Sequence, residues 1–265
     1  MMNQVRQTVK NIPGAVGLYN EISKRVRNPE WYFGYKRWES TRRMRMLKDK
    51  HRGQRCFIIG NGPSLNQMDL TKLKGQNTIG MNRIYLLFPK VGFQTTYYAC
   101  VNPLVVEQFG SDIENLPMTK FIGWHGRKWM DFTPSTILLA PTSRTPLFSE
   151  TPTNVLWEGA TVTYAAMQVA YYLGFEEVIL IGVDHNFVDK GKPHQEVVTE
   201  VHDANHFDPN YFGKGYRWNL PDLETSEIAY RMAKQHYEAN GRRILDATVG
   251  GKLTVFPKVD YDTLF

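Results

Sequence analysis

A glycine-rich turn behind an apolar run is the first place where this chain could do chemistry. Residues Cys56–Ile59 are apolar, and the turn Gly60–Ser64 (GNGPS) follows them directly. This order is typical of a buried strand, a tight turn and a helix over Leu65–Leu73 that Ser64 would cap. Backbone N–H groups and the positive end of a helix dipole at such a turn favour a phosphate. We therefore predict nucleotide contacts at Gly60, Asn61, Gly62 and Ser64.

The turn does not match the two best-known nucleotide loops. A dinucleotide fingerprint needs a third small residue and an acidic residue near the end of the second strand. In this chain Leu65 stands where the third small residue is needed, and Asn82 stands where the acidic residue is needed. No Gly-Lys-Ser/Thr follows the glycines, so a Walker loop is also absent from the sequence. NAD is therefore disfavoured as a cofactor.

Asparagines stand instead at three successive predicted strand ends, as Asn61, Asn82 and Asn102. In a parallel sheet these positions lie along one edge, where neutral amides could converge on one polar ligand. An amide both donates and accepts hydrogen bonds, which suits a ribose or a base edge as well as a phosphate. Each asparagine alone is an ordinary turn former. Together with the glycine turn they favour a nucleotide pocket.

A long stretch from Asp184 to Pro221 breaks the pattern of short connections. It is rich in Gly, His, Asn, Asp and Tyr and begins directly after the most apolar strand. A loop of this length inside a compact domain is usually a lid or an active-site insertion. Asp184 stands at its start and is counted among the predicted nucleotide contacts.

Four histidines in this stretch, His185, His194, His202 and His206, raise the possibility of a metal. His202 and His206 would share a face on a helix, but no third ligand has a firm spacing. We predict no bound metal and no required cofactor. The alternative is Mg²⁺ bridging a substrate diphosphate through an aspartate of this stretch.

The elements that must position these residues alternate between strands and helices. Strands are expected at 56–60, 78–81, 96–101, 120–124, 136–139, 178–183 and 243–245, and helices at 65–73, 104–109, 161–173 and 223–240. Continuous apolar strands predict a mostly parallel sheet covered on both faces. The expected fold is α/β, a Rossmann-like sheet with helices on both faces, a lid insertion and a helical N-terminal extension. We divide it into a basic extension (1–52) and a catalytic domain (53–265) with its lid at about 185–221.

The positive charge of the chain is concentrated near its beginning. Residues 1–55 hold 14 Lys and Arg against 4 Asp and Glu, and the remainder holds 18 against 22. This distribution disfavours nucleic acid as the partner of the catalytic domain. The aromatic and basic residues of 1–50 predict either packing on the domain or peripheral contact with an anionic membrane. No signal-peptide core is recognisable and both cysteines lie in apolar runs, so we expect a cytoplasmic protein, peripheral at the inner face of the membrane if residues 1–50 dock there.

Several stretches together resemble the bacterial CMP-sialic acid-dependent sialyltransferases that modify lipooligosaccharide. The wider superfamily includes MptE-like 6-hydroxymethylpterin diphosphokinases and flagellin-modification accessory proteins. The resemblance spans about residues 55–250 and rests on GNGPSL at 60–65, Met81-Asn82, Val101-Asn102-Pro103 and ATVTYAAMQVAYYLGFEEVILIGVD at 160–184. It implies one Rossmann-like domain with a mobile lid, a CMP-sugar donor, and inversion at the anomeric carbon without a metal.

The resemblance also implies roles for single residues. It assigns nucleotide contacts to Asn61, Asn82 and Asn102, and the hydroxyl at the start of the long helix to Thr161. The family's catalytic histidine matches His206, and a histidine suits the removal of a proton from an acceptor hydroxyl.

The chain departs from the family at two places. The arginine ahead of the long helix is replaced by Glu158, and the two tyrosines that bind the departing phosphate have no counterpart before His206. A leaving phosphate needs donors or cations, and Lys214 and Tyr216 are our candidates for that task.

The sequence thus favours a transferase with a nucleotide-activated donor, in the form of a CMP-sugar-dependent glycosyltransferase of surface polysaccharide or glycoconjugate synthesis. Its expected partners are a nucleotide-sugar donor and a glycan or glycolipid acceptor, and a homo-oligomer is left open. Two alternatives remain. One is an MptE-like diphosphokinase that moves pyrophosphate from ATP with Mg²⁺. The other is a non-catalytic nucleotide-binding accessory protein.

Overall fold

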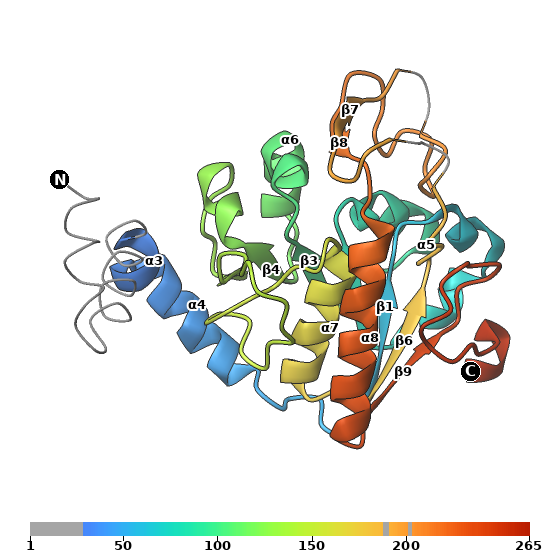
Figure 1. Cartoon of the computed structure of the whole chain (residues 1–265), viewed down its shortest axis with the longest axis horizontal. Helices are drawn as coiled ribbons and strands as arrows, with labels where there is room; N and C mark the ends of the chain where they lie inside the picture. Colours follow the sequence, from blue (N-terminus) through green and yellow to red (C-terminus); the bar gives the residue numbers. More distant parts are fainter. Residues whose placement is uncertain (1–28, 188–190, 201–202) are drawn as a thin grey trace, which may run out of the picture.

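A seven-stranded parallel sheet forms the centre of the molecule (Figure 1). The structure is a computed structural model, which describes residues 29–187, 191–200 and 203–265. The strands lie in the order β5-β4-β3-β2-β1-β6-β9, and every adjacent pair is parallel. Their bounds are β1 Arg55–Ile59, β2 Thr78–Met81, β3 Tyr97–Cys100, β4 Thr119–Gly123, β5 Thr136–Leu139, β6 Glu177–Ile181 and β9 Arg243–Asp246.

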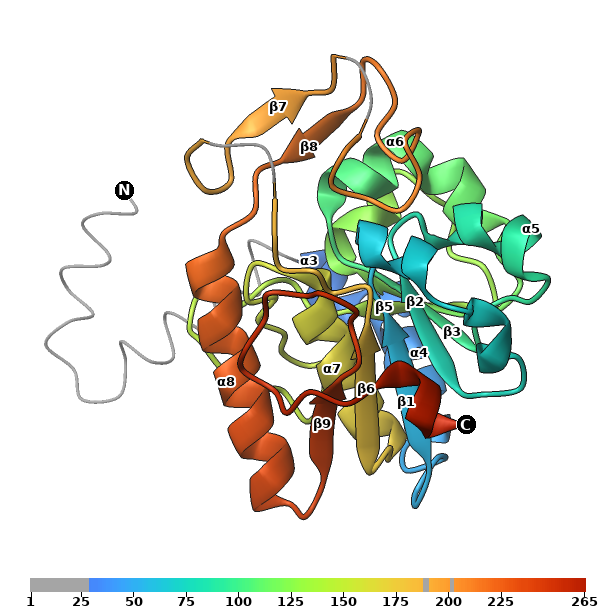
Figure 2. The same cartoon turned by 90° about the vertical axis from the view of Figure 1, so that its right-hand side faces the viewer.

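The sheet is buried on both faces. All residues of β2, β3 and β5 are buried, and so are all but the first residue of β1 and β6. Helices α7 (Val162–Leu173) and α8 (Leu223–Ala239) pack against each other and against the sheet. In Figure 2, α8 lies to the left of β6 and β1, and the short α5 (Phe88–Val91) lies to the right. The prediction of a Rossmann-like α/β fold is confirmed.

The segment after the glycine turn differs from the prediction of one helix over 65–73. Two short 3₁₀ helices stand there, η1 (Pro63–Gln67) and η2 (Leu70–Leu73). Met68 between them is extended, with φ −119° and ψ 142°, so no continuous helix forms. The prediction that Ser64 caps a helix is also wrong, because Gly62 occupies the N-cap position and Ser64 lies inside η1.

A polar side chain caps the helix that follows β3. Helix α6 (Pro103–Glu114) begins after Asn102, whose side chain accepts a hydrogen bond from the N–H of Leu104. It extends five residues beyond the predicted end at Phe109, where the helix is kinked. Two further 3₁₀ helices connect strands of the sheet, η3 (Ile84–Leu87) and η4 (Trp124–Lys128), and η5 (Tyr261–Leu264) ends the chain.

The predicted lid region rises above the carboxyl ends of the strands (Figures 1 and 2). It includes a two-stranded antiparallel pair, β7 (Glu196–Val198) and β8 (Arg217–Asn219). The side chain of Gln108 on α6 holds β8 by two bonds, donating to the carbonyl of Arg217 at 2.8 Å and accepting from its N–H at 2.7 Å. His202 of the predicted metal pair lies outside the described residues.

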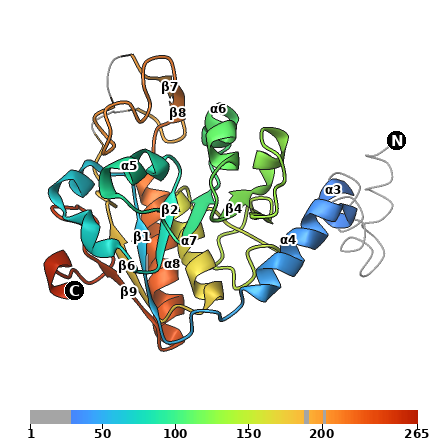
Figure 3. The ribbon, with the colours of Figure 1, turned by 180° about the vertical axis from the view of Figure 1, so that it is seen from behind.

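In the described part of the chain two helices precede the sheet, and the second of them packs against β5; Figure 3 shows both from behind, on the side of β4. They are α3 (Pro29–Phe33) and α4 (Tyr35–Met46). The N–H of Leu138 on β5 donates to Ser40 Oγ at 2.9 Å, and Arg43 donates to the carbonyl of Thr136 at 2.8 Å. Residues 1–28 of the predicted basic extension lie outside the described residues. Among the described helices, none is long and apolar enough to cross a membrane.

Candidate functional site

A cavity of about 360 Å³ lies at the carboxyl ends of the central strands. The chain adds β2 to β5 on one side of β1 and then places β6 on the other side, so the direction of winding reverses between β1 and β6. In open α/β sheets this switch point is where ligands bind. Residues that follow β1, β2, β3 and β6 line the cavity together with lid residues and the first turns of α7 and α8.

The two glycines of the GNGPS turn allow the ends of β1 and β6 to approach closely. A Cβ atom at Gly60 would collide with the carbonyl oxygen of Gly182, and one at Gly62 with the carboxylate of Asp184. The N–H of Gly62 donates to the carbonyl of Gly182 at 2.9 Å. The glycines are therefore required by the packing of two neighbouring turns, whatever the ligand.

Ser64 and Asp184 bind each other. The Ser64 hydroxyl donates to Asp184 Oδ2 at 2.7 Å, and the Ser64 N–H donates to Oδ1 at 3.1 Å. Burial raises the pKa of the Asp184 carboxyl, and the two bonds from Ser64 act against this rise. Asp184 lines the cavity and Ser64 does not. Ser64 thus holds the β6 turn in place from behind the surface that a ligand would meet.

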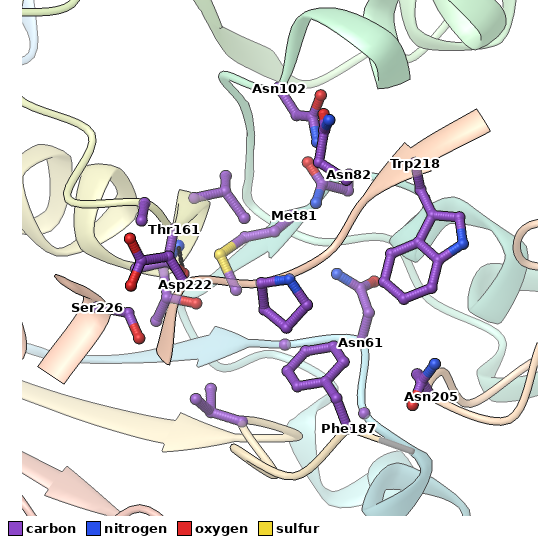
Figure 4. Close-up of a pocket in the computed structure, with 18 of the residues that line it drawn as sticks. Asn61, Met81, Asn82, Asn102, Thr161, Phe187, Asn205, Trp218, Asp222 and Ser226 are labelled. Atoms are coloured by element: carbon purple, nitrogen blue, oxygen red, sulfur yellow. Dashed lines mark hydrogen bonds between the residues drawn. The ribbon is translucent and has the colours of Figure 1, made fainter. Parts of the chain in front are cut away.

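We call Asn61, Asn82 and Asn102 the asparagine rim, and all three line the cavity (Figure 4). The Oδ1 atoms of Asn61 and Asn82 are buried and have no hydrogen-bond partner among the residues that the structure describes. Asn102 uses its Oδ1 to cap α6. A buried polar atom without a partner is costly, so the first two amides are suited to a ligand that supplies donor groups.

The backbone of Asn82 is held in a conformation that few residues adopt. Its φ is +50°, in the left-handed region, where asparagine is tolerated better than most residues. The Tyr98 hydroxyl donates to the Asn82 carbonyl at 2.6 Å, and the Asn82 N–H donates to the carbonyl of Ala99 at 3.1 Å. The neighbouring strand therefore holds the backbone from which the Asn82 side chain projects.

Two helix N-termini meet at the opposite end of the cavity, where Figure 4 shows Thr161, Asp222 and Ser226. Thr161 caps α7 by accepting from the N–H of Thr163, and Asp222 caps α8 by accepting from the N–H of Thr225. Both helices are long enough to carry a full dipole, with 12 and 17 residues. Their positive ends favour an anionic group between them.

Three histidines line the lid side of the cavity, and each is paired with a carboxylate; we call His185, His194 and His206 the histidine wall. His185 Nε2 lies 3.1 Å from Glu227 Oε1. His194 Nε2 lies 3.2 Å from Asp222 Oδ2. The hydrogen bond from His185 is the main reason why the pKa of Glu227 is lowered.

His206 forms the shortest of these pairs, with 2.7 Å between its Nδ1 and Asp203 Oδ2. Its ring is stacked on Tyr211 with 4.0 Å between the ring centroids. Because Asp203 binds Nδ1, Nε2 is the ring nitrogen that can exchange a proton with a ligand. A carboxylate in this position fixes the orientation of the imidazole ring. The sequence prediction named His206 but did not assign this role to Asp203, although the spacing of three residues was visible.

The loop around His206 is tied to the GNGPS turn. The N–H of Phe207 donates to the carbonyl of Asn61 at 2.9 Å, and the side chain of Asn66 donates to the carbonyl of Phe207 at 2.8 Å. Arg83 adds bonds to the carbonyls of Asn210 and Tyr211. These contacts join a residue of the lid to a residue of the rim that lies far away in the sequence.

The two residues predicted to neutralise the leaving phosphate lie outside the cavity. Lys214 is exposed, and Tyr216 packs with its ring 4.8 Å from that of Phe109. Among the described residues that line the cavity there is neither lysine nor arginine. The sequence suggested these two because they follow His206 closely, but the chain turns into β8 there and leads them away.

Glu158 contributes a further carboxylate to the cavity wall. Burial raises the pKa of its carboxyl group, and a hydrogen bond from the Thr142 hydroxyl counteracts part of this rise. The sequence marked Glu158 only as a departure from a family arginine. Among the described residues, no three histidine, cysteine or acidic side chains lie close enough to hold a metal ion.

Comparison with known proteins places this site in a family. The family model described as "6-hydroxymethylpterin diphosphokinase MptE-like" matches residues 34–190, which is more than half of the chain. The chain belongs to the MptE-like family. This membership indicates a transferase. No curated protein sequence matches the chain.

The matched region of this MptE-like protein covers the asparagine rim, Thr161, Asp184 and His185, and it ends before His194 and His206. The matched region begins at residue 34 and so includes α4. The resemblance to sialyltransferases inferred from the sequence began only at about residue 55 and left this helix out. Among solved structures, one similar chain is the "MAf glycosyltransferase from Magnetospirillum magneticum AMB-1", at 16% identity and a TM-score of 0.46. The match covers 96% of this chain and 43% of that one, so this chain spans less than half the length of the solved protein.

Proposed function

We propose that this protein is a glycosyltransferase that uses a CMP-sugar donor in the synthesis of a surface polysaccharide or glycoconjugate. One observation carries the proposal: the described lining of the cavity offers unpaired amides and two helix N-termini, but neither lysine nor arginine. This set of groups suits a ligand with one phosphate and many hydroxyl groups. The three phosphates of ATP would call for cations that this lining does not offer.

The residues divide the reaction between them. The asparagine rim binds the nucleoside through hydrogen bonds that its hydroxyl or amino groups donate. His206 Nε2 takes the proton from the acceptor hydroxyl as its oxygen attacks the anomeric carbon. The bond from that carbon to the phosphate oxygen breaks, and CMP leaves with the electron pair. Asp203 stabilises the resulting imidazolium, and the N-termini of α7 and α8 stabilise the phosphate. This sequence of steps requires no metal.

A diphosphokinase is the second candidate, and the description of the family favours it. In that reaction the same histidine would take a proton from an alcohol, and the oxygen would attack the β-phosphorus of ATP, with AMP as the leaving group. Mg²⁺ would have to neutralise the phosphates, and the carboxylates of Glu158, Asp184 and Asp222 line the cavity and offer the oxygen ligands that Mg²⁺ prefers. The two candidates therefore differ in nucleotide, product and metal dependence.

The deciding experiment measures nucleotide binding and then the product. Thermal shifts are recorded with CMP, CDP, UDP, ADP and ATP, each with Mg²⁺ and with EDTA. The proposal predicts that CMP stabilises the protein in EDTA, and that CMP is released from CMP-sialic acid in EDTA. Asn61→Ala should lower CMP affinity about tenfold, whereas Asn240→Ala, at the end of α8 and outside the cavity, should leave it unchanged.

Other outcomes separate the alternatives. Stabilisation by ATP only with Mg²⁺, with AMP formed from ATP and 6-hydroxymethylpterin, would establish the diphosphokinase instead. CMP binding without any turnover, unaffected by His206→Ala, would indicate a nucleotide-binding accessory protein. If none of the five nucleotides stabilises the protein, the nucleotide pocket itself is refuted.

A further inference from the structure

The first two described helices carry the most exposed apolar side chains of the described structure. Phe33 is 76% exposed, Tyr35 65%, Trp38 62% and Met46 63%, and each large apolar side chain elsewhere among the described residues is exposed by 55% or less. Large apolar groups scattered singly on a surface need no explanation, but a cluster of them does. We call Phe33, Tyr35, Trp38, Arg42, Arg45 and Met46 the aromatic–basic surface.

The members of this surface on α4 lie on one side of the helix. Tyr35, Trp38, Arg42 and Arg45 follow each other at spacings of three and four residues, which places them along one face. The rings of Tyr35 and Trp38 are neighbours, with 6.2 Å between their centroids. The exposed aromatic residues thus form the N-terminal half of a stripe whose C-terminal half is basic.

The opposite side of these helices is firmly packed, so the exposed side is not a loosely attached segment. Met44 is fully buried, and Trp31 lies edge-on against Trp124 with 4.9 Å between the ring centroids. Ser40 and Arg43 bind the backbone of β5 and of the loop before it. Figures 1 and 3 show α3 and α4 along one edge of the molecule, on the side of β4 and β5 and away from β9.

The charge of this edge is positive. Its three acidic residues are already paired: Glu30 with Arg127, Glu39 with Arg42 and Arg43, and Asp49 with Arg52. Arg45, Lys48 and Lys50 are exposed beside them. The rest of the chain has the opposite balance, because residues after 55 hold more acidic than basic side chains. The molecule is therefore polarised, with its basic end at the aromatic cluster.

We propose that the aromatic–basic surface docks on an anionic lipid bilayer. Tyrosine and tryptophan side chains lie favourably at the headgroup level because their rings are apolar and their tips are polar. Arginine and lysine beside them are attracted by the negative surface potential. Docking along this edge would hold the transferase at a membrane, where a lipid-linked acceptor is concentrated in two dimensions. This inference does not depend on which nucleotide the cavity binds.

The test is co-sedimentation of the full chain with vesicles, in the absence of nucleotide. Vesicles of phosphatidylcholine with phosphatidylglycerol should bind the protein, and pure phosphatidylcholine vesicles should bind it at least tenfold more weakly. The double variant Tyr35→Ala/Trp38→Ala should reduce binding about tenfold or more. Arg45→Glu should reduce it more than fivefold, since each basic residue near the surface contributes about a fivefold effect. Added salt should weaken the wild type in the same direction.

Matched controls lie elsewhere on the surface. Ile228→Ala removes an exposed apolar side chain on α8, and Lys74→Glu reverses an exposed charge before β2; both should bind vesicles as the wild type does. Circular dichroism melting verifies that each variant is folded. Equal binding to both vesicle types, or undiminished binding of the double variant, overturns the proposal. A wild-type dimer in light scattering that becomes a monomer in the double variant would overturn it too, because the surface would then face a second copy of the chain.

Discussion

The asparagine rim and the histidine wall line the same cavity, but they are built differently. The rim stands at the ends of β1, β2 and β3, and the backbone of Asn82 is bound to the neighbouring strand. Two of its amide oxygens have no partner among the described residues. In the wall each histidine already has a carboxylate partner. The rim offers unused hydrogen-bonding capacity, and the wall offers imidazole rings that carboxylates already hold in place.

This difference suggests a division of labour. Polar groups without hydrogen-bond partners contribute most to the binding free energy of a ligand that stays in place through the reaction, because the ligand supplies the missing partners. Groups already paired gain less from binding, but an imidazole that a carboxylate holds in place is oriented to exchange a proton with a substrate. The family match includes the whole rim and only His185 of the wall. We expect the rim to determine affinity and the wall to determine rate.

The largest expected effect is that of His206→Ala on turnover. Removal of a general base lowers the rate of a transferase by about 10²–10⁴-fold. CMP affinity should stay within about threefold of the wild type, because the rim is unchanged. Rate is measured as CMP released from the donor, and affinity by calorimetry. His236→Ala, whose ring stacks on Phe148, is the control. An equal loss of affinity and rate would abolish the distinction between rim and wall.

Substitution of Asn82 should produce the next largest effect, on affinity. Asn82→Gly removes the amide but tolerates a φ of +50°, so CMP affinity should fall about tenfold with little change in stability. Asn82→Ala removes the same amide and adds backbone strain of about 1–2 kcal/mol. Calorimetry and urea denaturation measure the two quantities. Equal stability of both variants would show that the left-handed backbone is not what selects asparagine here.

The smallest effect concerns Glu158, a cavity carboxylate that accepts a hydrogen bond from the Thr142 hydroxyl and forms no ion pair among the described residues. Burial raises its pKa above the ordinary value of 4.5, so the native state holds the proton more tightly than the unfolded chain. The free energy of unfolding therefore decreases as pH rises through the raised native pKa. Glu158→Gln keeps an acceptor for Thr142 but has no such proton.

The melting temperature of Glu158→Gln relative to the wild type should accordingly rise as the pH increases through the range in which the native Glu158 carboxyl loses its proton. Parallel thermal denaturation of both proteins measures this difference. If this difference in melting temperature stays constant or declines as the pH rises, the Glu158 carboxylate has a cationic partner in solution. The cavity would then be less acidic than the described residues that line it indicate.

Much of the site was accessible from local patterns in the sequence. The apolar runs predicted the strands because a strand buried on both faces requires apolar residues throughout, and the parallel order followed from their alternation with helices. The positions of Asn61, Asn82 and Asn102 at strand ends then placed them at one edge of the sheet. Thr161 was predicted at the start of a helix and caps α7. Each of these inferences needs only neighbours in the chain and the geometry of a parallel sheet.

Long-range contacts decided the rest. Ser64 was predicted to cap a helix, but its hydroxyl is bound to Asp184, 120 residues later. Lys214 was predicted to reach the cavity, but it is exposed in the segment before β8 and does not line the cavity. The pairing of His185 with Glu227 joins the end of β6 to α8, and no spacing in the sequence reveals it. Periodicity encodes which face of an element is buried, whereas the partner that a polar side chain meets depends on how distant elements pack.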